Sequence, residues 1–151
     1  MNNDFHFQPS GRFKYFILPM EFTKGYEMMT PQERNMEKVK KLLDVAFNEK
    51  NPGMAAEYVT DEYIQHNPQV PTGKAGLIAA LPMFYQAIPT LSWKLKHIWA
   101  DGDYVIVHSA YNFGKENAVV DIFRFKGEKI DEHWDVVQEI PSKMAHNNGM
   151  F

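Results

Sequence analysis

The chain has 151 residues, 44% hydrophobic and 14% aromatic, which suits one domain burying roughly two thirds of its unfolded surface. Its 16 basic and 19 acidic residues are scattered and leave a net charge of −3, which argues against nucleic acid as a partner. Cysteine is absent, which excludes disulfides and thiolate chemistry, and the apolar stretch 15–20 is too short to cross a membrane, so we expect a soluble, cytoplasmic protein.

The first 29 residues lack any helical or strand period, and the periodic sequence begins only at Thr30. We therefore predict an N-terminal extension at 1–29 and a single domain at 30–151. Three explanations stay open for the extension: disorder, a strand exchanged between subunits through 15–18, or a native start at Met28 or Met29.

Three helices are predicted next. Thr30, Pro31 and Glu33 have the spacing of a capping box, and an apolar stripe at helical intervals then runs from Met36 to Phe47. A second, short helix opens at the Asn-Pro-Gly of 51–53, and a brief extended piece at 63–66 follows it. The third helix spans 77–88, and its proline at 82 should kink or interrupt it.

In the rest of the chain, side chains alternate with the period of two that is typical of β-strands. Segments 92–100 and 103–113 flank Asp101-Gly102, a strong hairpin signal. A second hairpin joins 118–126 to 129–140 through Gly127-Glu128. Helices followed by long antiparallel strands predict an α+β fold in which the helices pack on one face of a mainly antiparallel sheet.

Counting outward from two-residue turns predicts which side chains share a face. In the second hairpin, His133 and Asp135 should lie beside the apolar Val120 and Ile122, whereas Asp121 should point to the opposite side unless a bulge reverses the alternation. In the first hairpin, one aromatic face carrying two histidines should collect these residues: Trp93, Leu95, His97, Trp99, Tyr104, Ile106, His108 and Ala110.

Both faces of the predicted sheet are largely apolar. Three helices can cover only one of them, so the other would stay exposed unless a second subunit packs on it. We therefore predict a homodimer formed through the outer face of the sheet.

Three segments resemble the SnoaL-like family of the nuclear-transport-factor-2-like superfamily. They are the YIQHNP of 63–68, the ADGD of 100–103 and the KIDEHWDVV of 129–137. The resemblance covers about 30–151 and implies a cone-shaped α+β fold, a curved sheet wrapped around a long helix with a deep pocket inside. Relatives include a polyketide cyclase that works by aldol condensation, limonene epoxide hydrolase, scytalone dehydratase, ketosteroid isomerase and non-catalytic binding domains.

The resemblance also implies the acid/base residue. The cyclase's catalytic aspartate is matched here by Asp135, and His66 matches a family histidine at the pocket mouth, where it could polarise a substrate carbonyl or hold Asp135. An apolar site can give a carboxylate the basicity needed to take a proton from carbon or water. The alternative is that Asp135 lies at the solvent-exposed rim of the pocket or forms an ion pair with Arg124 or a lysine.

Two functions therefore stay open. The first is an acid/base lyase, isomerase or cyclase without a cofactor or metal, acting on a small, largely apolar carbonyl compound. The second is a domain of the same fold that binds a hydrophobic small molecule without chemistry. Candidate substrate-binding residues are Tyr63, Trp93, His97, Trp99, Tyr104, His108 and His133.

Overall fold

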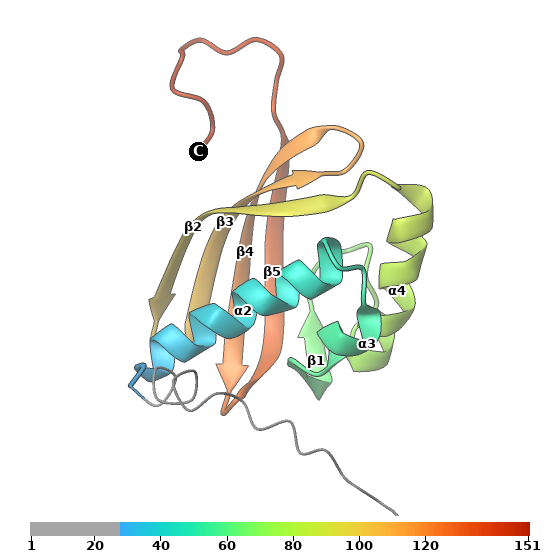
Figure 1. The fold of residues 1–151 in the computed structure, drawn as a ribbon, viewed down its shortest axis with the longest axis vertical. Coiled ribbons are helices and arrows are strands. Elements are labelled where there is room, and N and C mark those ends of the chain that lie inside the picture. Colours follow the sequence, from blue (N-terminus) through green and yellow to red (C-terminus); the bar gives the residue numbers. More distant parts are fainter. Residues whose placement is uncertain (1–27) are drawn as a thin grey trace, which may run out of the picture.

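The computed structural model describes residues 28–151, and the extension expected at 1–29 lies almost entirely outside them. One five-stranded sheet, in the order β1-β5-β4-β3-β2, packs against three helices (Figure 1). The elements in chain order are α2 (Pro31–Phe47), α3 (Pro52–Ala56), β1 (Val59–Gln65), α4 (Lys74–Ala87), β2 (Ser92–Asp101), β3 (Tyr104–Asn112), β4 (Glu116–Lys126) and β5 (Lys129–Glu139). No helix among the described residues has the length and apolar character needed to cross a bilayer.

Helix α2 begins where the capping box predicts. The Thr30 side chain accepts a hydrogen bond from the Glu33 backbone at 3.2 Å, and the Glu33 carboxylate accepts one from the Thr30 N–H at 2.7 Å. These reciprocal bonds satisfy two backbone donors that a helix start leaves open. The apolar stripe of α2 then lies in the core, and the helix itself crosses the inner face of the sheet (Figure 1).

The segment expected as a brief extended piece is a full strand. β1 has seven residues and pairs in parallel with β5, so the sheet is mixed and has five strands. The chain then turns into α4, which continues through Pro82 without interruption. Gly76 permits this close turn, because a Cβ there would lie 2.5 Å from the carbonyl oxygen of Pro71.

Two β-bulges change the register expected from the turns. In β2 the register shifts between Leu95 and His97, and in the second hairpin it shifts between Arg124 and Phe125. The extra residue opposite Arg124 is Asp131, which accepts hydrogen bonds from Thr60 at 3.1 Å and from Arg124 at 2.9 Å. A bulge moves every later side chain of its strand to the other face of the sheet.

The core lies between α2 and the inner face of the sheet. Each of β3 and β4 contributes every second side chain to it, including Val105 and Val107 from β3 and Phe123 and Phe125 from β4. Towards the end of α2 the core opens into a hollow, and the side chains there change from apolar to polar.

Candidate active site

A cavity of about 640 Å³ opens between the inner face of β3–β5 and the helices α2 and α4. The helices contribute an apolar wall that includes Leu42, Phe47, Leu81 and Phe84. The opposite wall is polar and comes from the ends of the strands and the loop after β1. Its members are Tyr63, Gln65, Asn67, Gln69, Tyr111, Asp121, His133 and Asp135. This division suits a largely apolar ligand with one polar end.

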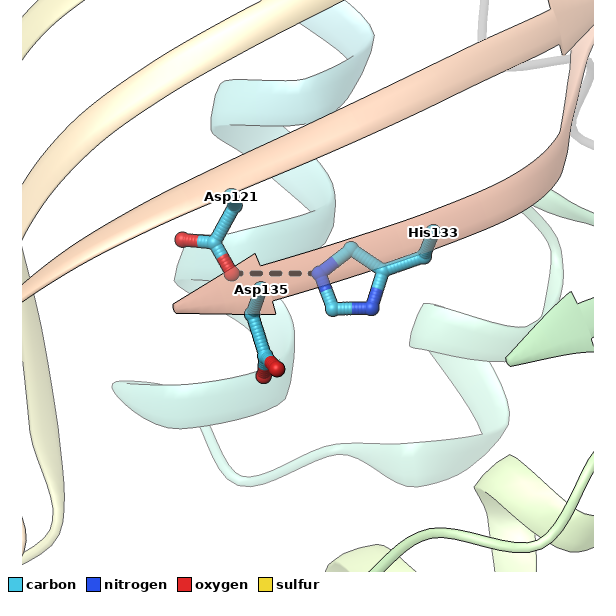
Figure 2. A group of neighbouring side chains, drawn as sticks. All are labelled: Asp121, His133 and Asp135. Carbon is cyan, nitrogen blue, oxygen red and sulfur yellow. Dashed lines mark hydrogen bonds and ion pairs between the residues drawn. The ribbon is translucent and has the colours of Figure 1, made fainter. Parts of the chain in front are cut away.

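Asp121, His133 and Asp135 form the centre of the polar wall (Figure 2). Asp121 on β4 pairs across the sheet with Asp135 on β5, and His133 lies two residues before Asp135 on the same face. The Nε2 atom of His133 lies 3.1 Å from Oδ1 of Asp121. Asp121 is only 3% exposed, so its carboxyl group depends on protein partners and not on water.

A second partner of Asp121 is the hydroxyl of Tyr111, which donates to Oδ2 at 3.1 Å. Burial, together with the nearby charge of Asp121, raises the pKa of Tyr111 well above its ordinary value. The tyrosine therefore remains a proton donor. Burial and the charges of Asp121 and Asp135 likewise raise the pKa of Tyr63.

The last residue of β1 and the loop after it hold the other two members, His133 and Asp135. Gln65 Oε1 lies 2.9 Å from His133 Nδ1, and Asn67 Nδ2 donates to Asp135 Oδ2 at 2.6 Å. Behind the imidazole, the ring of Phe123 stacks on His133 with centroids 4.6 Å apart. Each functional group of the centre is thus fixed by a hydrogen bond or a packed ring.

No lysine or arginine lines this cavity among the described residues. The expected alternative of an Asp135–Arg124 pair is wrong, because Arg124 forms its ion pairs with Asp131 and Glu132. Oxygen and nitrogen atoms of Asp121, His133 and Asp135 also lie within 4.8 Å of one another, a spacing that could admit a cation. Both ring nitrogens of His133 are engaged in hydrogen bonds, however, and we assign no metal here.

Three of the residues expected at the site do line the cavity: Asp135, Tyr63 and His133. The expected pairing of the second hairpin is wrong, because the bulge at Asp131 places Asp135 opposite Asp121 and not beside Val120. Asp121 was expected on the opposite face, and it instead lies at the centre of the site.

His66 lies outside the cavity. Its Nε2 is 2.8 Å from Glu132 Oε1, and its ring stacks on Trp134 with centroids 4.9 Å apart. The expectation that His66 holds Asp135 is therefore wrong. Successive side chains of an extended segment point to opposite sides, so the next residue, Asn67, reaches Asp135 instead.

The aromatic residues expected in the pocket lie elsewhere. Trp93 points inward, but it packs on the core and donates from Nε1 to Ser109 Oγ at 2.8 Å. Trp99, His97, His108 and Phe151 form an outer aromatic row, with successive ring centroids 5.5, 5.8 and 5.2 Å apart. Tyr104 belongs to the same outer face, because it lies four residues before His108 on β3. The bulge in β2 separates Trp93 from Trp99.

Five residues of the polar wall had no role in the sequence-based site: Gln65, Asn67, Gln69, Tyr111 and Asp121. Two of them belong to the YIQHNP segment, whose alternation with Tyr63 could have shown that Gln65 and Asn67 share a side. For Asp121 the signal was absent, because its side of the sheet depends on a bulge that no glycine or proline marks.

A family model described as a SnoaL-like domain matches residues 39–133. No curated protein matches the chain. The matched segment runs from the middle of α2 to His133, so it includes both the apolar wall and most of the polar wall.

Solved structures share the fold. A cystatin-fold protein from Novosphingobium aromaticivorans has a TM-score of 0.63 and 21% identity, over 68% of this chain and 97% of that one. A proposed polyketide cyclase from Acidithiobacillus ferrooxidans has a TM-score of 0.62 and 18% identity, over 72% of this chain and 91% of that one. A proposed SnoaL-like polyketide cyclase from Jannaschia sp. has a TM-score of 0.62 and 19% identity, over 72% of this chain and 89% of that one. Likeness at this identity shows the fold alone.

Proposed function

Because the chain belongs to the SnoaL-like domain family, we propose that it is an acid/base enzyme of the cyclase, lyase or isomerase type. Its substrate would be a small, largely apolar carbonyl compound held in the cavity. The observation that carries this proposal is the facing pair of Asp121 and Asp135, with His133 hydrogen-bonded to Asp121 and all three side chains lining the cavity. A carboxylate and a hydrogen-bonded acid at one point of an apolar hollow are the groups that enolate chemistry needs.

Asp135 is the proposed base. Its one side-chain hydrogen bond comes from the neutral amide of Asn67, and no cation among the cavity-lining residues holds its charge. The carboxylate would take a proton from the carbon next to the substrate carbonyl. The electron pair of the broken C–H bond moves to the carbonyl oxygen and forms an enolate.

The Asp121–His133 pair is the proposed acid. It would donate a hydrogen bond, and then a proton, to the carbonyl oxygen as negative charge develops there. The enol carbon could then attack a second carbonyl carbon, as in an aldol closure. The enol oxygen would return its proton to the Asp121–His133 pair as the carbonyl re-forms, and Asp135 would give its proton to the new alkoxide. Alternatively Asp135 returns its proton to a different carbon while the enol oxygen returns its own to the pair, which is an isomerisation.

The site favours this enzyme over a domain that only binds its ligand. A structural aspartate is expected to pair with a lysine or arginine, and within residues 28–151 Asp135 pairs with neither. Holding two carboxyl groups and an imidazole together beside an apolar wall has an electrostatic cost that binding a hydrophobic molecule does not require.

Deuterium exchange tests the proposal without knowledge of the natural substrate. The chain is incubated in D2O with apolar ketones such as 2-tetralone, and loss of the α-proton signal is followed by proton NMR. We expect exchange above the buffer rate, and Asp135→Asn should reduce the enzymatic rate by about 100-fold or more.

The matched control is His66→Gln, which removes an ionisable group from the neighbouring outer position. It should keep the exchange rate within about twofold, because His66 does not reach the cavity. Full exchange by a folded Asp135→Asn protein would remove the proposed mechanism and favour a binding role.

We also propose that two copies of the chain associate through the outer face of the sheet. Trp99 is 53% exposed there and Val136 is 72% exposed, and Val120 lies opposite Val136 on the same face. Exposed aromatic and aliphatic side chains in one area are typical of a surface that packs against another subunit.

A further inference from the structure

The side-chain amide of Gln65 has only one orientation that fits its neighbours. The backbone N–H of Asn67, which can only donate, lies 2.9 Å from Oε1 of Gln65. The amide nitrogen then points to the Tyr63 hydroxyl, to which it donates at 3.1 Å. The atom of Gln65 that faces His133 is therefore an oxygen, which can only accept.

This orientation determines the protons on His133. Its Nδ1 lies 2.9 Å from the Gln65 oxygen, so Nδ1 must carry a proton. The contact between Nε2 and Asp121 Oδ1 at 3.1 Å then needs one further proton, either on the ring or on the carboxyl group. In both arrangements the Asp121–His133 pair as a whole is neutral and holds a proton that it can give away.

We propose that Gln65 is a positioning residue that holds the proton of His133 on Nδ1 and thereby keeps a second, transferable proton between His133 and Asp121. Without an acceptor at position 65, a neutral imidazole could carry its single proton on Nε2 and donate it in a hydrogen bond to an ionised Asp121. The pair would then be negative beside Asp135 and would have no proton to donate as an acid.

In the part of the chain that the structure describes, no other group near His133 could set this state. The titratable side chains around His133 are Asp121, Asp135, Tyr63 and Tyr111, and Tyr111 already donates to Asp121. The cavity-facing residues of α2 and α4 are apolar. Phe123 covers one face of the imidazole and leaves only its two nitrogen edges for hydrogen bonds.

The proton state follows from the hydrogen bonds alone, whereas its use in catalysis rests on the proposed function. It is tested by long-range ¹⁵N–¹H NMR of the labelled full chain near neutral pH, with His133 assigned by the loss of its signals in His133→Gln. We expect a protonated Nδ1 in the native chain. In Gln65→Met, the Nδ1 resonance should move to the position of an unprotonated ring nitrogen, with Nε2 protonated instead.

Two further variants separate positioning from packing. Gln65→Glu keeps an acceptor oxygen and should keep Nδ1 protonated, whereas Gln86→Met makes the same side-chain change at an exposed position of α4 that does not line the cavity and should leave His133 unaffected. An unprotonated Nδ1 in the native chain would overturn the proposal whether or not any variant folds, and so would an unchanged ring in folded Gln65→Met. Because no substrate is added, either result is independent of the deuterium exchange test.

Discussion

The two faces of the sheet use similar residues in opposite ways. On the inner face, two aspartates and a histidine meet in a hollow, and hydrogen bonds to Gln65, Asn67 and Tyr111 hold them. On the outer face, His97 and His108 stack between Trp99 and Phe151 without a hydrogen bond between their rings. Histidine beside aromatic rings is therefore common to both groups, and of the two only the inner group includes carboxylates, among them Asp121 at 3% exposed.

The two faces should differ most in how far truncation of an aromatic side chain lowers the free energy of unfolding. Phe123 is 2% exposed and packs on His133, so Phe123→Ala should lower the free energy of unfolding by about 3–5 kcal/mol. Trp99→Ala on the outer face should lower it by no more than about 1 kcal/mol in dilute solution, where subunits are separate. Urea unfolding measures the free energy of unfolding of both variants, and equal losses in the two would contradict the expected difference between the faces.

Association should depend on the outer face alone. Trp99→Glu introduces a charge into the exposed apolar area, and it should weaken the dimer by tenfold or more, since an unpaired charge at an interface costs over about 1.4 kcal/mol. Sedimentation equilibrium measures the dissociation constant, with Glu57→Lys on α3 as the control. A native chain that stays monomeric at high concentration would refute the dimer.

A smaller effect is expected at Tyr85, which connects helix α4 to helix α2. The Tyr85 hydroxyl donates to the Ala46 carbonyl at 2.7 Å, and burial raises the pKa of Tyr85 to about 12. Tyr85→Phe should therefore lower the free energy of unfolding by about 1 kcal/mol at neutral pH.

The pH dependence of the stability difference between the native chain and Tyr85→Phe tests the direction of the Tyr85 pKa shift. A folded-state pKa above the ordinary value of 10.0 stabilises the protein fully below pH 10, and the contribution is lost as the pH rises toward 12. The gap between native chain and Tyr85→Phe should narrow over this range in urea unfolding. A gap that widens would contradict the assigned direction of the shift.

Much of the fold could be predicted from the sequence because its signals are local. The capping box at Thr30, the glycine turns and the period of each element each depend on a few neighbouring residues. The family resemblance adds the identity of the fold, which the structural neighbours confirm.

The site was harder to predict from the sequence because its geometry depends on β-bulges. One extra residue at Asp131 decides whether Asp121 or Val120 faces Asp135, and a similar residue in β2 separates Trp93 from Trp99. Such a shift is set by contacts distant in sequence, such as Thr60 with Asp131. Alternation within β1 is local, in contrast, and it does place Tyr63 and Gln65 on the side of the cavity.

The central claim is that the inner hollow, not the outer aromatic row, receives the ligand. Titrating 2-tetralone into the ¹⁵N-labelled chain and following the amide signals tests it directly. The account predicts that the signals of Asp121, His133 and Asp135 move and saturate while those of His97, Trp99 and His108 stay in place. Saturable movement confined to the outer residues would contradict it.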